Sequence, residues 1–212
     1  MAEPPDFDDA FRARLLDLLV WRRDVRAFQA RPLPDGTLER LVGVATLAPS
    51  VGLSQPWRFV AVDNAARRAE VRACFEACNG EALRRQDPER ASSYARLKLA
   101  GLDDAPCHLA VFADRDTLQG HKLGRLTMPE TIDYSAVMAV HTLWLAARAE
   151  GIGVGWVSIL DPARIGEILD VPAGWHFIGY FCIGYPVEES DTPALERLAW
   201  ERRQAQGGLL RR

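Results

Sequence analysis

No stretch of this sequence is apolar for long enough to cross a membrane. A membrane-spanning helix needs about 20 consecutive apolar residues, and polar or charged residues interrupt every apolar run before that length. Residues 1–9 are acidic and rich in proline, so they lack the basic start and apolar middle of a signal peptide. We therefore expect a cytoplasmic protein that does not bind membranes.

Cysteine motifs are missing too. Cys74, Cys78, Cys107 and Cys182 form no Cys-x-x-Cys pair, and such scattered use is typical of reduced thiols in a cytosolic protein. Cys74 and Cys78 would share a helix face, but no His or Cys pair at ligand spacing completes a zinc site. We expect buried or half-buried thiols and no metal.

Charge of one sign does not dominate either. The chain has 26 Lys and Arg against 29 Asp and Glu, which gives a formal net charge of −3. This balance argues against a nucleic-acid or anionic-membrane partner. A small basic site for a phosphorylated ligand is still compatible with it.

Helical and extended patterns alternate along the 212 residues, which predicts one domain that mixes α and β structure. Residues 1–10 form an N-terminal arm and residues 186–212 form an extension that must lie across the domain or a partner subunit. The unpatterned stretch 114–131 is a long loop, and such loops are often functional. Apolar spacing and capping residues predict helices over about 8–22, after 34–35, from Asp63 to Asn79-Gly80, over 87–101, over 133–150 and from Asp161-Pro162, with strands over 57–62, 107–113, 152–159 and 175–184.

The helix over 133–150 has the strongest apolar pattern. We expect its core-facing side to consist of Tyr134, Val137, Met138, His141, Trp144 and Leu145.

Three segments carry residues suited to chemistry, and the first is Arg22-Arg23-Asp24-Val25-Arg26. Arginines bind phosphate through forked, charge-assisted hydrogen bonds. If the segment is helical, Arg22 and Arg26 share a face and Asp24 points the opposite way. Arginines in the last turn of a helix also complement its dipole while lying in solvent, so this motif alone does not decide between the two roles.

The second segment runs from Ala48 to Trp57, between a predicted helix and a predicted strand. Its small residues allow a flat ligand to come close to the backbone, and Ser50 and Gln55 offer polar contacts. An ordinary turn has the same pattern of proline and glycine residues.

The third segment, Gly151 to Ser158, contains three glycines, but its order of helix, glycines and strand is the reverse of a dinucleotide-binding loop. Small residues in a strand instead permit close approach by another backbone or by a planar ring. Ser158 ends the strand without the Gly-x-Ser-x-Gly elbow of serine hydrolases. On its own, Ser158 is interpreted as a turn residue with a hydrogen-bonded hydroxyl.

Together and in this order, the three segments resemble the nitroreductase superfamily, over residues from about 20 to about 185. Asp24 stands where the flavin reductases of that superfamily usually have Ser, and Leu53 stands where they usually have Asn. Both departures resemble the branch of 5,6-dimethylbenzimidazole synthases, as do the sequences of residues 97–101, 123–125, 134–135, 143–151 and 155–159.

The resemblance implies an α+β fold with a central, mostly antiparallel sheet flanked by helices. It also implies an intertwined homodimer with two FMN sites at the subunit interface. In the synthase branch, a separate flavin reductase uses NAD(P)H to supply reduced FMN. The reduced FMN then reacts with O₂ and is fragmented to 5,6-dimethylbenzimidazole, the lower ligand of vitamin B12, and to erythrose 4-phosphate.

The resemblance also assigns roles to residues. Asp24 would act as acid or base during fragmentation, and Ser158 would direct a later step. The arginines Arg22, Arg23 and Arg26 would hold the FMN phosphate. The flavin would be lined by Val25, Ser50, Gly52, Leu53, Gln55, Leu99, Gly155, Trp156, Val157 and Ser158.

Two other functions fit the same sequence. An NAD(P)H-dependent flavin reductase or nitroreductase of this fold would recycle its flavin without destroying it. A non-catalytic flavin-binding protein would neither oxidise a nicotinamide nor consume the flavin.

Overall fold

Four antiparallel strands form one sheet in the part of the chain that the structure describes, in the order β1-β2-β4-β3. The structure is a computed structural model, and it describes residues 3–95, 97, 101–204 and 209–212. The strands are β1 (Trp57–Ala61), β2 (Cys107–Asp114), β3 (Gly153–Val157) and β4 (Trp175–Gly184). The expected α+β class with an antiparallel sheet is confirmed, and β3 lies at one edge of the sheet.

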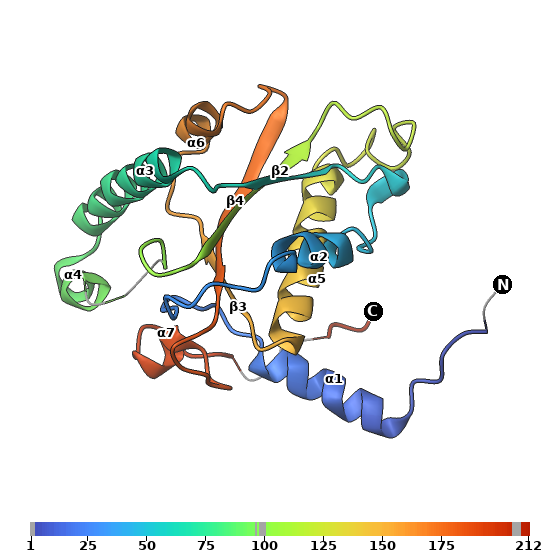
Figure 1. Ribbon diagram of the computed structural model, residues 1–212, viewed down its shortest axis with the longest axis horizontal. Coiled ribbons are helices and arrows are strands. Elements are labelled where there is room, and N and C mark those ends of the chain that lie inside the picture. The colour runs from blue at the N-terminus through green and yellow to red at the C-terminus, as the bar shows by residue number, and fades with distance from the viewer. Residues whose placement is uncertain (1–2, 96, 98–100, 205–208) are drawn as a thin grey trace.

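Helices cover both faces of the sheet (Figure 1). Helices α2 (Thr37–Ala45) and α5 (Thr131–Ala149) lie on one face, and α3 (Ala65–Arg84) and α6 (Pro162–Leu169) lie on the other. Strand β2 faces both layers because successive side chains of a strand point to opposite sides. Its Leu109 and Val111 belong to the core under α2 and α5, while Ala110 and Phe112 belong to the core under α3 and α6.

A buried pair of polar side chains lies within the second of these cores. His108 and Tyr180 come from neighbouring strands, and the His108 Nδ1 is 2.9 Å from the Tyr180 hydroxyl oxygen. Burial lowers the pKa of His108 to about 4. The imidazole is therefore neutral near pH 7 and serves the sheet as a satisfied polar group.

Helix boundaries differ from the sequence prediction where capping residues compete. Helix α3 begins after Asn64, whose side chain accepts hydrogen bonds from the backbone of Ala66 and Arg67; the predicted cap was Asp63. The helix also continues through Asn79-Gly80 to Arg84. Gly80 costs a helix interior only about 1 kcal/mol, which is too little to end a helix of this length.

Helix α4 (Pro88–Ala95) starts at the predicted proline but ends before the predicted limit near Gly101. Residues 98–100 lie outside the described part of the chain. Beyond the sheet, the C-terminal extension contains the short helix α7 (Ala194–Arg197) and returns to α4, where the rings of Trp200 and Tyr94 are 6.0 Å apart.

The prediction for the inward face of α5 was wrong for four of its six residues, whereas Trp144 is buried and Leu145 is half-buried. Tyr134, Val137 and Met138 are 55%, 36% and 45% exposed, and His141 is exposed. The residues that pack on the sheet are smaller on average: Ile132, Ser135, Ala136, Ala139, Val140, Leu143, Trp144 and Ala147. Both faces of this helix are apolar, so periodicity alone could not select the one that the sheet buries.

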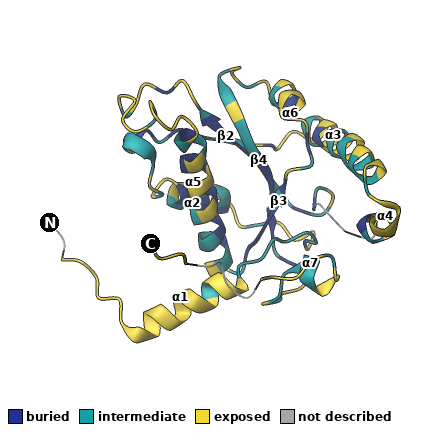
Figure 2. Ribbon diagram, turned by 180° about the vertical axis from the view of Figure 1, so that it is seen from behind, coloured by how far each residue is buried: buried dark blue, intermediate teal, exposed yellow. Residues whose placement is uncertain are grey.

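Helix α1 (Asp9–Trp21) projects from the body of the molecule (Figure 1). None of its 13 residues, all within the described part of the chain, is buried. Figure 2 shows the helix exposed along its length. Its exposed apolar side chains are Phe11, Leu15, Leu16, Leu19, Val20 and Trp21.

No helix in the described part of the chain combines the length and the apolar character needed to span a bilayer.

Candidate functional site

The Arg22–Arg26 segment, called the arginine segment below, is extended and not helical. Helix α1 ends at Trp21, and Arg22 already has extended backbone angles (φ −72°, ψ 112°). The Val25 N–H donates to the Val154 carbonyl (3.1 Å), and Asp24 forms a parallel bridge with Val154. The arrangement considered for a helical segment, with Arg22 and Arg26 on one face opposite Asp24, therefore does not apply, because the segment pairs with the free edge of β3.

The glycines of β3 explain how the segment comes so close. A Cβ atom on Gly155 would lie 2.0 Å from the Val25 carbonyl oxygen, and one on Gly153 would lie 2.7 Å from the Val25 side chain. Neither distance is compatible with a side chain larger than hydrogen. The sequence allowed two uses of these small residues, close approach by another backbone or by a planar ring. The structure shows the approach of another backbone.

This pairing holds the Asp24 carboxylate at both oxygens. Oδ1 accepts a hydrogen bond from the Trp156 backbone N–H (2.9 Å), and Oδ2 accepts one from Arg26 Nε (2.8 Å). The Asp24 side chain is 32% exposed and that of Arg26 is 19% exposed. Asp24 is thus fixed in orientation and still accessible.

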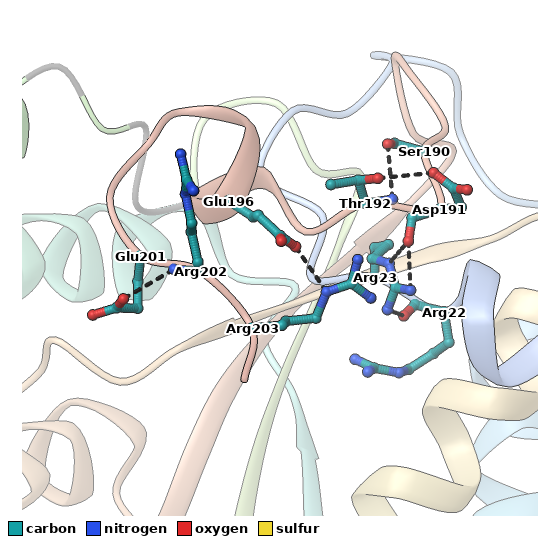
Figure 3. Close-up of polar contacts among 9 residues, drawn as sticks. All are labelled: Arg22, Arg23, Ser190, Asp191, Thr192, Glu196, Glu201, Arg202 and Arg203. Carbon is teal, nitrogen blue, oxygen red and sulfur yellow. Dashed lines mark hydrogen bonds and ion pairs between the residues drawn. The ribbon is translucent and has the colours of Figure 1, made fainter. Parts of the chain in front are cut away.

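The other two arginines of the segment gather with a third from the C-terminal extension. Figure 3 shows Arg22, Arg23 and Arg203 around the loop that contains Asp191. Partial burial and then the charges of Arg22 and Arg203 lower the pKa of Arg23. The Asp191 and Glu196 carboxylates act on Arg23 in the opposite sense. Arginines gathered in this way can bind a dianion such as a phosphate.

Local contacts orient each member of this cluster. The Arg22 guanidinium lies over the Trp144 ring, 5.1 Å from its centroid. Arg23 donates from Nε and Nη2 to the Asp191 carbonyl, and Arg203 Nε donates to the Glu196 carboxylate (2.7 Å).

Arg203 was missed at the sequence level. It lies 180 positions after Arg23 in a tail without periodicity, so no local pattern connects the two residues. The one available signal was the Arg202-Arg203 pair in an extension that had to lie across something else.

A cavity of about 190 Å³ adjoins the arginine segment. Asp24 and Arg26 line it from one side, and Glu188, Ser190 and Thr192 of the C-terminal extension line it from the other. Asp24 therefore faces a space in which a ligand can be held beside the arginine cluster.

The second predicted element, here called the 50–55 turn, lies at the other end of α5. The Val51 N–H donates to Ser135 Oγ (3.0 Å), and the Gln55 N–H donates to Ser50 Oγ (3.1 Å). The turn includes the short 3₁₀ helix η1 (Val51–Leu53). Gly52, Leu53 and Gln55 all have positive φ angles (55°, 56° and 41°), a conformation that non-glycine residues adopt mainly at constrained sites.

The long loop over 114–131 lies on this turn. The Gln119 side-chain amide donates to the Leu53 carbonyl (2.8 Å) and to Gln55 Oε1 (3.0 Å). A Cβ on Gly52 would lie 2.8 Å from the Leu123 carbonyl oxygen. The loop therefore packs directly on the turn.

One atom in this turn lacks the partner that burial normally requires. Ser54 is 2% exposed, and its Oγ has no hydrogen-bond partner among the described residues. Buried hydroxyl groups are nearly always hydrogen-bonded. The orphaned hydroxyl and the constrained backbone fit a turn that completes its contacts with a bound polar ligand, as expected for a turn that lines a flavin.

The remaining predicted residues lie in two places. Gly155 and Val157 are buried in β3, while Ser158 is exposed just after the strand and two positions from Trp156. Trp156 packs its ring against Phe181 and Trp144, with centroids 5.1 and 6.5 Å apart. Leu99 lies outside the described residues.

The arginine segment and the 50–55 turn are separated along α5. The Trp144 indole N–H donates to the Arg23 carbonyl (3.2 Å), whereas Ser135 binds the turn. Ser135 and Trp144 are nine residues apart, which corresponds to roughly 14 Å along a helix. The two predicted parts of the site are therefore brought to the same helix but to different stretches of it.

The chain is similar to known proteins. The profile of the nitroreductase family matches residues 19–185, which include both segments and the whole sheet. This chain belongs to the nitroreductase family. The resemblance inferred from the three segments is thereby confirmed.

Individual members of the family are closely similar to this chain. A 5,6-dimethylbenzimidazole synthase of Rhodospirillum rubrum is 57% identical over 204 residues, which cover 96% of this chain and 97% of the relative. One from Rhodobacter capsulatus is 47% identical, covering 92% and 95%. A crystal structure of oxidized iodotyrosine deiodinase bound to FMN and 3-iodo-L-tyrosine shares the fold, with a TM-score of 0.71, 21% identity and coverage of 93% of this chain and 97% of that one.

Proposed function

We propose that this nitroreductase-family chain converts reduced FMN and O₂ into 5,6-dimethylbenzimidazole, with erythrose 4-phosphate formed from the ribityl phosphate. The observation that carries the proposal is Asp24, a carboxylate with both oxygens held and with access to a cavity beside an arginine cluster. Relatives with 57% and 47% identity carry the name of this activity. In the flavin reductases that the sequence resembles, a serine usually stands in place of Asp24.

The arginine cluster is proposed to hold the FMN phosphate. Arg22 and Arg23 come from the arginine segment, and Arg203 adds the third charge from the extension. Charge-assisted hydrogen bonds to a phosphate are worth about 1.5–3 kcal/mol each. The sequence assigned Arg26 to the phosphate together with Arg22 and Arg23, and its Nε donates to Asp24.

Asp24 is proposed to accept and return protons during fragmentation. The bound reduced flavin supplies the electrons and the carbon skeleton of the product. A positioned carboxyl group contributes roughly 10²–10⁴-fold to a step with proton transfer. Ser158, at the end of the same strand that fixes Asp24, is proposed to act later at the flavin end of the site.

The 50–55 turn is proposed to line the flavin ring. Ser50, Leu53 and Gln55 present polar and apolar contacts there, and Gly52 allows the loop over 114–131 to close on the turn. The buried hydroxyl of Ser54 would gain its missing partner from the ligand or from a water bound with it.

A second copy of the chain is proposed to complete the site. The cavity beside Asp24 is about 190 Å³, below the roughly 300–1,000 Å³ of typical small-molecule sites. Helix α1 and the outer face of α5 expose apolar side chains, and such patches mark protein interfaces. Figure 2 shows exposed positions on both helices. A homodimer that buries both helices would bring parts of two chains around each FMN.

Reduced FMN is proposed to come from a separate reductase that uses NAD(P)H. The four cysteines are free thiols, which agrees with the proposed location in the reducing cytoplasm.

The test is to mix the purified protein with chemically reduced FMN, admit air and analyse the products by mass spectrometry. Protein-dependent 5,6-dimethylbenzimidazole is the expected result. Complete recovery of intact oxidised FMN would overturn the proposal. Steady oxidation of NAD(P)H by the isolated protein would then assign it to the flavin reductases.

A further inference from the structure

Arg26 makes a different contact from Arg22 and Arg23, although it lines the same cavity as Arg23. The cations that act on Arg23 are Arg22 and Arg203. Arg26 instead directs its Nε to Asp24 Oδ2 at 2.8 Å, and its side chain is only 19% exposed. Its contact with Asp24 distinguishes Arg26 from the other two arginines of the segment.

The extended backbone explains the contact between Arg26 and Asp24. Residues two positions apart in an extended segment point to the same side, which places Arg26 beside Asp24. The pairing of Val25 with Val154 keeps the segment extended, and Gly155 permits it. The contact between Arg26 and Asp24 is thus built into the backbone and does not depend on a flexible surface encounter.

Two donors from different directions fix the carboxylate. The torsion that rotates an aspartate carboxylate is broad, so a single hydrogen bond leaves it free to turn. Here the Trp156 N–H holds Oδ1 and Arg26 Nε holds Oδ2. Each carboxylate oxygen accepts about two hydrogen bonds, so both retain a lone pair for a ligand in the cavity that Asp24 lines.

We propose that Arg26 is a positioning residue: through its Nε it holds the Asp24 carboxylate in the orientation that the reaction uses. The kinetic part of this inference rests on the proposed function. The structural part, that Arg26 orients Asp24, is independent of it.

Two substitutions separate this role from phosphate binding. Arg26→Gln keeps an N–H donor at the position of Nε but removes the charge and the guanidinium fork. Arg26→Met keeps a similar length and has no donor. Arg22→Gln serves as the reference for loss of a phosphate ligand.

Two measurements on these proteins test the inference kinetically. The first is the affinity for FMN relative to riboflavin, which lacks the phosphate, by flavin fluorescence. The second is the single-turnover rate of benzimidazole formation. We expect Arg26→Met to lower the rate by about 10- to 100-fold, as misplacement of a reacting group does, while Arg26→Gln retains most of it. Neither should change the ratio of FMN to riboflavin affinity, which Arg22→Gln should reduce.

Two results would overturn the inference. A selective loss of FMN affinity in both Arg26 variants would make Arg26 a phosphate ligand. Equal losses of rate in both variants would show that the reaction depends on the charge of Arg26 and not on the hydrogen bond from its Nε.

The orientation of Asp24 is measured separately, through the Trp156 amide resonance in ¹⁵N NMR spectra. This N–H donates to Asp24 Oδ1, so its shift reports the carboxylate. Arg26→Met should move the resonance toward its position in Asp24→Ala, and Arg26→Gln should leave it in place. An unmoved resonance in Arg26→Met would refute the positioning role, even in a protein that consumes no flavin.

Discussion

The arginine segment and the 50–55 turn are held in place by different means. The arginine segment pairs with an edge strand, so backbone hydrogen bonds and two glycines fix it. The turn is held by side chains of α5 and of the long loop, namely Ser135 and Gln119, and it contains three residues with positive φ. The arginine segment is thus held mainly through backbone contacts, whereas the turn is held mainly through side-chain contacts.

Replacement of the carboxylate should produce the largest effect. Asp24→Asn keeps an oxygen that accepts from the Trp156 N–H, so the segment stays paired with β3. We expect FMN binding to be retained and benzimidazole formation to fall by roughly 10²–10⁴-fold. Mass spectrometry of single-turnover mixtures and fluorescence titration with FMN check the two parts. Unchanged product yield would remove Asp24 from the mechanism.

Loss of the close approach to β3 should be the next largest effect. In Gly155→Ala the new methyl group would lie 2.0 Å from the Val25 carbonyl oxygen, so the arginine segment must move. We expect a loss of about 3 kcal/mol in the free energy of unfolding, because strain of this kind lies at the severe end of single substitutions.

Gly43→Ala is the matched control for this prediction. A Cβ on Gly43, within α2, meets no atom within 4 Å among the described residues. Alanine in a helix is more stable than glycine by about 1 kcal/mol, so this variant should be neutral or stabilised. Urea unfolding of both variants makes the comparison, and equal stability would show that the segment is not held tightly against β3.

Removal of the third cation should weaken phosphate binding without affecting the turn. Arg203→Met removes one charge-assisted contact, and we expect the affinity for FMN to fall by about 10- to 100-fold. The affinity for riboflavin should not change. Arg202→Met, at the neighbouring position, is the control, and a similar loss in that variant would attribute the effect to net charge.

The smallest effect is expected at the turn. Ser135→Ala leaves the Val51 N–H without its acceptor, at a cost of about 1–2 kcal/mol. The affinity for FMN and for riboflavin should fall together, because the ring contact is weakened and the phosphate contact is not. Thr142→Ala, which also removes a hydroxyl bonded to a carbonyl one turn earlier in α5, should have no such effect. A selective loss of FMN affinity in Ser135→Ala would contradict the assignment of the turn to the ring.

Much of this architecture follows from local patterns. The strands and most helix starts were predicted because apolar alternation, Asp-Pro caps and proline stops act within a few residues of the positions they determine. Asp24 and Leu53 distinguished the branch of the family because they are departures inside otherwise recognisable segments. The roles of all the site residues, including Asp24 and Ser158, remain predictions.

Other features depended on contacts between distant parts of the chain. Whether Arg22–Arg26 was helical depended on a free strand edge 130 positions later in the sequence, which no periodicity within five residues reveals. The inward face of α5 was decided by the sheet, since small residues allow the helix to pack closely and the larger apolar ones remain outside.

The sequence by itself therefore determined the fold class, the order of the elements and the unusual carboxylate among the arginines, because each is encoded in neighbouring residues. Only the tertiary structure decided that Arg26 lies beside Asp24, that Arg203 joins Arg22 and Arg23, and that the loop closes on the 50–55 turn. The first contact depends on the pairing of the arginine segment with β3, 130 positions later in the chain. The other two join residues that are far apart in the sequence, so their geometry exists only after the backbone has folded.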